Sequence, residues 1–173
     1  GRVKQAVRRG SEPDIIVLTK ETLFFIEAKV SAGNKTTPSS PGKVEEGYTK
    51  GGGEWWSQVF TEDFQTIAIT NKRYELARFW LLGTWIAWQL GLKFRLISLV
   101  LDGKDKTIEQ DFRPFLKKRP HDFLRKTWQD IETFVQAHAP STPDKALLDQ
   151  YFKTKSMGYD SKQQLLGMFR YAR

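Results

Sequence analysis

The chain has 173 residues and a mass of 20.1 kDa, a length that suits one domain with at most a small appendage. Hydrophobic residues make up 39% of it and aromatic residues 13%, enough to build a core and to exclude wholesale disorder. It contains no cysteine, which excludes disulfides and thiolate chemistry and favours a reducing, cytoplasmic setting. Lys and Arg number 28 against 20 Asp and Glu, and the net charge of +8 favours an anionic partner, nucleic acid first.

The start of the chain and its longest apolar stretch indicate whether a secretion signal or a membrane span is to be expected. The chain does not begin with Met, and we expect that further residues precede Gly1 in the full protein. We expect no secretion signal, because no charged and then apolar leader opens the sequence. We expect no membrane span, because polar residues interrupt the longest apolar stretch, residues 76–92, at Arg78, Thr84 and Gln89.

The first clear elements are two short strands, residues 14–19 and 22–30. Both runs are apolar and rich in β-branched or aromatic side chains, and the polar pair Lys20 and Glu21 joins them. Two such runs on either side of a tight polar turn predict a β-hairpin.

The next stretch, residues 31–53, changes in character. It contains the Pro- and Gly-rich segments 38–42 and 51–53 and few large apolar side chains, which predicts a long mobile loop. Residues 54–60 predict a short helix or turn, and residues 66–70 a strand or the start of a helix. In the pair Trp55 and Trp56, we weigh contact with a substrate against simple packing.

The strongest helix is predicted over residues 72–90, with Asn71 as its N-cap and Gly91 as its stop. Its apolar residues recur every three or four positions and predict one wide buried face: Leu76, Phe79, Trp80, Leu82, Trp85 and Ile86. The same spacing assigns Trp88 to the core. A strand over 94–101 follows, so that helix, glycine turn and strand form half of an α/β crossover.

The rest of the chain is predicted to be helical, over residues 120–138, 144–152 and 161–173. We therefore expect an α/β fold whose core spans residues 1–140 and whose helical extension spans 141–173.

The hairpin also carries the charged residues that are candidates for catalysis and metal binding. Glu27 and Lys29 are two positions apart on the second strand and so share one face, because side chains alternate along a strand. If Asp14, at the head of the first strand, lies on that face, two carboxylates and an ammonium converge. Oxygen ligands without His or Cys suit Mg²⁺, or Mn²⁺ as a substitute, and the carbonyl of Ala28 would add a further oxygen. Lys29 would then orient or deprotonate a water, or stabilise a charged transition state.

This pattern resembles the PD-(D/E)xK nuclease superfamily, whose fold is the restriction-endonuclease-like fold. The matching residues are Pro13-Asp14 and, one hairpin later, Glu27-Ala28-Lys29, followed by a helix and a strand. The resemblance covers residues 3–101 and implies a mixed central sheet flanked by helices, with Mg²⁺-dependent endonuclease activity on DNA. It implies that Asp14 and Glu27 are metal ligands, that Lys29 is the catalytic lysine and that Gln58 is a supporting polar residue.

One feature departs from the family pattern. Members commonly carry an acid on a helix before the first motif strand, whereas residues 1–11 contain no carboxylate. That helix lies upstream, or Glu12 takes the role, or the site is impaired; we favour the upstream helix.

Several basic residues are candidates for binding a nucleic-acid backbone, although solvated helix ends explain them nearly as well: Arg8, Arg9, Lys72, Arg73, Lys117, Lys118 and Arg119. The leading hypothesis is a DNA endonuclease, with RNA as an open alternative substrate. A nuclease-fold domain that binds nucleic acid without cutting it, and a basic protein-interaction module, are the rivals. Cutting both strands requires a homodimer or two successive events, and the sequence leaves that choice open.

Overall fold

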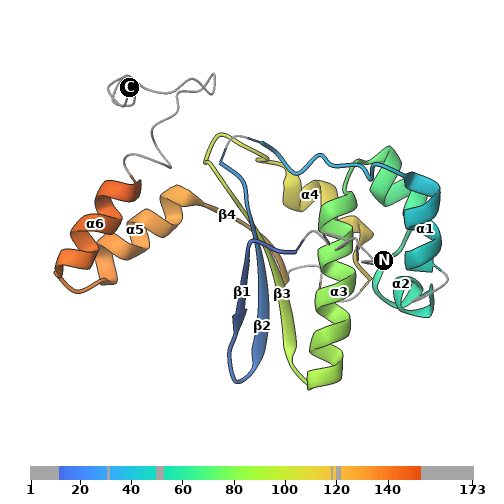
Figure 1. Cartoon of the computed structure of the whole chain (residues 1–173), viewed down its shortest axis with the longest axis horizontal. Helices are drawn as coiled ribbons and strands as arrows, with labels where there is room; N and C mark the ends of the chain where they lie inside the picture. The colour runs from blue at the N-terminus through green and yellow to red at the C-terminus, as the bar shows by residue number, and fades with distance from the viewer. Residues whose placement is uncertain (1–11, 31, 50–52, 118, 120–121, 153–173) are drawn as a thin grey trace, which may run out of the picture.

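The structure is a computed structural model, and it describes residues 12–30, 32–49, 53–117, 119 and 122–152. One mixed sheet lies at its centre, with strands in the order β1-β2-β3-β4 (Figure 1). The strands are β1 (Ile15–Leu18), β2 (Thr22–Ala28), β3 (Lys93–Val100) and β4 (Phe123–Thr127). The helical elements are α1 (Pro41–Thr49), α2 (Gly53–Val59), η1 (Gln65–Thr70), α3 (Tyr74–Leu90), α4 (Ile108–Phe112), η2 (Arg113–Phe115), α5 (Trp128–His138) and α6 (Pro143–Tyr151).

The sheet confirms the predicted hairpin and crossover. β1 and β2 pair antiparallel, with Ile15 opposite Ile26, while β2 and β3 run parallel and are connected through α3. β4 adds a second parallel neighbour to β3. The protein is therefore of the α/β class, with an open four-stranded mixed sheet.

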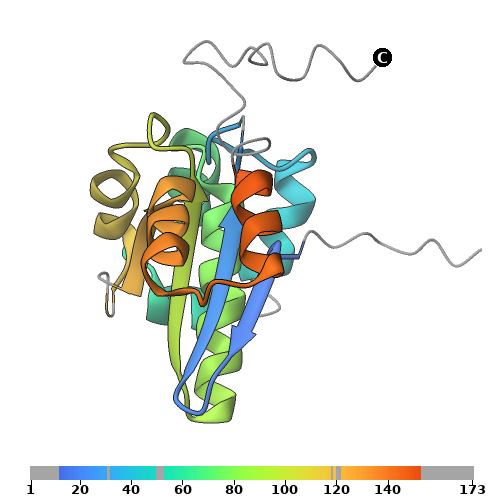
Figure 2. The same cartoon turned by 90° about the vertical axis from the view of Figure 1, so that its left-hand side faces the viewer.

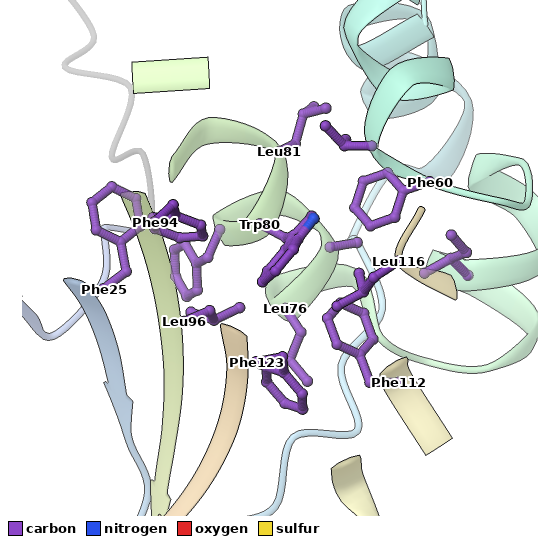
Figure 3. Close-up of a cluster of buried hydrophobic side chains, with 14 of the residues drawn as sticks. Phe25, Phe60, Leu76, Trp80, Leu81, Phe94, Leu96, Phe112, Leu116 and Phe123 are labelled. Atoms are coloured by element: carbon purple, nitrogen blue, oxygen red, sulfur yellow. The ribbon is translucent and has the colours of Figure 1, made fainter. Parts of the chain in front are cut away.

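Helices cover both faces of the sheet. α3 and the shorter α1, α2 and α4 lie on one side, and α5 and α6 lie on the other (Figures 1 and 2). The core fills the space between the sheet and α3, where Phe25 and Phe94 meet edge to face and Trp80 packs against Phe94 (Figure 3). Since Leu23 and Phe25 face this core, the alternation along β2 turns Glu27 to the same side.

Close packing between α3 and β3 depends on a glycine. Gly83 is buried in α3, and a Cβ atom built on it would lie 2.1 Å from the ring of Phe94. The absence of a side chain at this position lets the helix approach the strand. α3 ends as predicted at Gly91, whose φ of 66° is the left-handed conformation that glycine adopts easily.

Two expectations about local structure were wrong, and one open alternative is decided. Residues 41–49 form helix α1 inside the stretch predicted as a loop, where Tyr48 stacks on Phe64. For residues 66–70, which the sequence left open between a strand and the start of a helix, the helical alternative is confirmed, because they lie in the helical element η1. The predicted helix 120–138 is divided between strand β4 and helix α5, because the five residues of β4 pair with β3, and tertiary pairing outweighs local helix propensity.

The burial of α3 also differs from the prediction. Trp80 is buried as expected, but Leu82, Trp85 and Trp88 are exposed. The start of the helix differs too, because Arg73 and not Asn71 is the N-cap residue.

Helix α6 occupies 143–151 within the predicted extension, and the predicted helix 161–173 lies outside the described residues. No helix in the described part of the chain has the length and apolar character needed to cross a membrane.

Candidate active site

The carboxyl end of β2 brings three charged side chains together beneath the start of α3. Glu27 is 3% exposed, and its Oε1 accepts a hydrogen bond from Nζ of Lys29. The same ammonium donates to Oε2 of Glu75, in the first turn of α3, over 2.9 Å. Lys29 thus lies between two carboxylates, one on the sheet and one on the helix.

Asp14 joins this group through the backbone of the motif. Its Oδ2 accepts a hydrogen bond from the backbone N–H of Ala28 over 2.8 Å. Continuing the alternation of the β1–β2 pairing from Ile15 opposite Ile26 turns Asp14 to the face of Glu27. The three motif side chains, those of Asp14, Glu27 and Lys29, therefore lie at one end of the hairpin, and Asp14 remains exposed there.

Burial dominates the electrostatics of this site. The desolvation of Glu27 raises the pKa of its carboxyl group against the lowering effect of Lys29, and the nearby charges of Glu75 and Asp14 raise it further. Burial also acts to lower the pKa of Lys29, but its hydrogen bonds to Glu27 and Glu75 outweigh it, so that the pKa is raised. Lys29 is therefore a protonated hydrogen-bond donor at neutral pH.

The loop after β2 is hydrogen-bonded to the start of α3 beside the site. The hydroxyl of Thr36 accepts the N–H of Glu75 over 3.0 Å, which satisfies a free donor in the first turn of α3. Arg73 is 6% exposed and binds Asp111 over 3.1 Å. A helix N-terminus carries a partial positive charge, which favours carboxylates and other anions beside it.

A second polar cluster adjoins Glu27. Ser98 on β3 is the direct partner of Glu27 in the parallel register, and it is fully buried. Asn34 donates its side-chain amide to Ser98 Oγ and to Asp105 Oδ2, each over 2.8 Å. Charged and polar groups therefore continue from β2 across the carboxyl end of β3.

The structure places Gln58 elsewhere. Gln58 lies on α2, where with Trp88, Phe94 and Arg119 it lines a cavity of about 250 Å³. Phe94 is four residues before Ser98 on β3, so this cavity is roughly 13 Å along the sheet from the partner of Glu27. The structure does not bring Gln58 together with the motif residues.

The two neighbouring tryptophans of α2 have different surroundings. Trp56 is buried in the core. Trp55 is half-buried, donates its Nε1–H to the hydroxyl of Thr84 over 3.2 Å and packs against Trp88. Of the two readings weighed for this pair, packing accounts for Trp56, and Trp55 is also held by contacts within the protein.

The basic candidates separate into three groups. Lys72 is exposed and immediately precedes α3, at the same end of the sheet as Glu75. Arg73 is buried and paired with Asp111, so it is not part of an exposed phosphate-binding surface, contrary to the expectation. The exposed Lys117 donates to the carbonyl of Ser57 over 2.6 Å, and Arg119 is also exposed. The remaining candidates, Arg8, Arg9 and Lys118, lie outside the described residues.

Sequence reasoning missed two residues at this site. Glu75 stands in the first turn of the strongest predicted helix, and the start of a crossover helix lies near the carboxyl ends of the parallel strands, so this acid was an available signal. Asn34 had no local signal, because only the folded loop brings it to Ser98, 64 positions away.

The oxygen donors of this site suit a hard divalent cation. They are the carboxylates of Asp14 and Glu27 and neutral oxygens near them, and Mg²⁺ is commonly held by one or two carboxylates while it keeps several waters. Oε2 of Glu27 is buried and has no hydrogen-bond partner among the residues that the structure describes, so one carboxylate oxygen remains for such an ion. In the ranges that the structure describes, no three His, Cys, Asp or Glu side chains are grouped so as to hold a metal by themselves.

Comparisons with protein-family models, with curated proteins and with solved structures give no match to this chain.

Proposed function

We propose that this protein is a metal-dependent endonuclease that hydrolyses DNA phosphodiester bonds and belongs to the PD-(D/E)xK superfamily, with its restriction-endonuclease-like fold. The observation that carries the proposal is the convergence of Asp14, Glu27 and Lys29 at one end of the hairpin, with the carboxylate of Glu27 buried. Burying a carboxylate is costly. A buried acid beside an exposed one therefore favours a functional site over an ordinary surface ion pair.

The donor set supports Mg²⁺ as the cofactor, with Mn²⁺ as its substitute. Asp14 and Glu27 would hold the ion, and the carbonyl of Ala28 is the neutral oxygen that the motif adds to them. A divalent cation bound there supplies a water of lowered pKa and shields charge on the phosphate.

Lys29 and Glu75 have separate roles in this proposal. Lys29, as a cation held between two carboxylates, would donate hydrogen bonds and stabilise the negative charge that develops on the phosphate. Glu75 would keep the ammonium in place, because its bond to Lys29 extends from the rigid first turn of α3. The protonated state of Lys29 favours this role over that of a general base.

The positive charge of the chain supports nucleic acid as the substrate. The net charge of +8 attracts a polyanion, and Lys72 exposes an ammonium at the end of the sheet that carries the site. RNA is the alternative substrate class. A homodimer that cuts both strands, and a reducing cytoplasmic setting favoured by the lack of cysteine, belong to the same proposal.

The test is cleavage of supercoiled plasmid DNA by the full-length protein, with Mg²⁺, with Mn²⁺ and with EDTA. We expect nicked or linear product only with metal, and at least about a hundredfold slower cleavage by Glu27→Gln. Glu21→Gln is the matched control, because Glu21 is an exposed acid in the β1–β2 turn. Binding of DNA without cleavage under either metal would instead favour the non-cutting nuclease-fold domain.

A further inference from the structure

Two buried oxygen atoms near the proposed metal site have no hydrogen-bond donor among the described residues. They are Oε2 of Glu27 and Oδ1 of Asn34, whose residues are 3% and 0% exposed. A buried acceptor without a partner destabilises the fold, because it has lost its hydrogen bond to water and gained none in return. Both acceptors belong to residues linked to Ser98, one by strand register and one by a hydrogen bond, which indicates that a positively polarised group belongs between the sheet and the loop.

The orientation of the Asn34 amide is fixed by its partners. Its Nδ2 and its backbone N both donate to Oδ2 of Asp105 over 2.8 Å, and a carboxylate only accepts. The opposite orientation would turn the Asn34 carbonyl oxygen toward that carboxylate. Nδ2 must therefore face Asp105 and Ser98, which leaves Oδ1 as the free end of the side chain.

The clamp on Asn34 is built into the backbone. Asp105 has a φ of 46°, a conformation that is uncommon for residues with side chains and is more often seen for Asp and Asn. A Cβ atom built on Gly33 would lie 3.0 Å from Asp105 Oδ1, so the glycine before Asn34 leaves room for this carboxylate. Arg73 Nη1 adds a 3.5 Å contact to the carbonyl of Asn34.

Ser98 connects the two orphan acceptors. It is the register partner of Glu27 on β3, and its hydroxyl accepts the Asn34 amide. Neighbouring positions on adjacent strands are about 4.8 Å apart, so Ser98 is next to Glu27 in the sheet and is hydrogen-bonded to Asn34, and all three residues are buried.

We propose that Asn34 contributes Oδ1 to the coordination shell of the divalent cation assigned to Glu27. This inference rests on the proposed function. Charge supports a neutral ligand here: the carboxylates of Asp14 and Glu27 balance a doubly charged ion, while Lys29 is already matched by Glu75. A third carboxylate would leave the buried site with an excess negative charge, whereas an amide oxygen adds a hard ligand without charge.

The test measures Mn²⁺ binding to the full chain by electron paramagnetic resonance titration, without nucleic acid. Asn34→Ala removes Oδ1, and we expect it to weaken Mn²⁺ binding by about tenfold or more. Ser98→Ala is the matched control, because it removes a partner of the amide and keeps Oδ1, and we expect less than about a threefold change. A folded Asn34→Ala protein that binds Mn²⁺ as tightly as the unmodified chain overturns the proposal.

Asn34→Asp provides a second test if the alanine variant does not fold. It restores an oxygen at this position but places a second carboxylate against Asp105. A ligand role predicts a larger rise in melting temperature on adding Mn²⁺ than in the unmodified chain, and a purely structural role predicts no larger rise. If Glu27→Gln loses Mn²⁺ while both Asn34 variants behave as the unmodified chain, this inference alone fails. If Glu27→Gln also keeps Mn²⁺, the proposed metal site fails.

Discussion

Replacing Lys29 with Met tests whether the buried carboxylate of Glu27 depends on its cation. Methionine keeps most of the side-chain volume and removes the ammonium, which leaves Glu27 buried beside the charges of Glu75 and Asp14. Removing one partner of a buried ion pair costs about 3–5 kcal/mol, and we expect the lower end, about 3 kcal/mol at pH 8, because the side chain of Lys29 is 19% exposed.

The pH dependence of this loss follows from Glu27. Burial raises the folded pKa of its carboxyl group above the ordinary value of 4.5, so the folded state favours the protonated form. Stability that depends on this proton is present below about 4.5 and is lost as the pH rises through the folded pKa. Without Lys29 this pKa rises further, and Lys29→Met should therefore be much less destabilising at pH 5 than at pH 8.

The assay is urea unfolding at both pH values in buffer without divalent cations. The double variant Glu27→Gln/Lys29→Met is the internal control. We expect it to recover most of the lost stability, because Gln has no charge that would be left buried without a partner. A loss below about 1 kcal/mol at pH 8 would refute the reasoning, as would an equal loss at pH 5 and pH 8.

Two further predictions concern the scaffold. Gly83→Ala should lower the free energy of unfolding by about 2 kcal/mol or more, because its Cβ would overlap the ring of Phe94. Gly47→Ala in α1 should be neutral or stabilising, because no atom of the described residues lies within 4 Å of the added Cβ; equal thermal unfolding of the two variants would contradict this. Thr127→Ala should lower the free energy of unfolding by about 1 kcal/mol and speed amide hydrogen exchange in the first turn of α5, because the Thr127 hydroxyl accepts the N–H of Asp130 in a capping box. Unchanged protection at the start of α5 would argue against this role.

The hairpin and the crossover could be predicted from the sequence because their signals are local. The apolar runs around Lys20 and Glu21, and the long helix that ends at Gly91, each carry their own turn or cap. The spacing of Glu27 and Lys29 likewise predicts a shared face from strand geometry alone.

The errors arose where distant contacts decide the structure. Strand β4 has five residues and owes its conformation to pairing with β3. A local signal did exist for the end of this strand, because the spacing of Thr127 and Asp130 is that of a capping box and indicates a helix that starts at residue 128. Apolar residues surround α3 on more than one side, so periodicity alone did not tell buried Trp80 from exposed Trp85. Tertiary contacts decide both the conformation of β4 and which face of α3 is buried.

The contacts that join these neighbours to the motif residues could not be predicted from the sequence for the same reason, although the helix start that carries Glu75 could be. Glu75 reaches Lys29 across 46 positions and Asn34 reaches Asp105 across 71, through a loop whose own composition predicted no structure. Such contacts depend on how the loop packs between the sheet and α3. The motif residues could be predicted individually, and their partners required the fold.

The most direct measurement is the anomalous scattering of Mn²⁺ in crystals of the full-length protein. We expect one strong peak within about 2.3 Å of carboxylate oxygens of both Asp14 and Glu27, and its loss in Glu27→Gln crystals. Well-ordered crystals soaked at millimolar Mn²⁺ that show no peak there, or a peak bound by other side chains, would contradict the central claim.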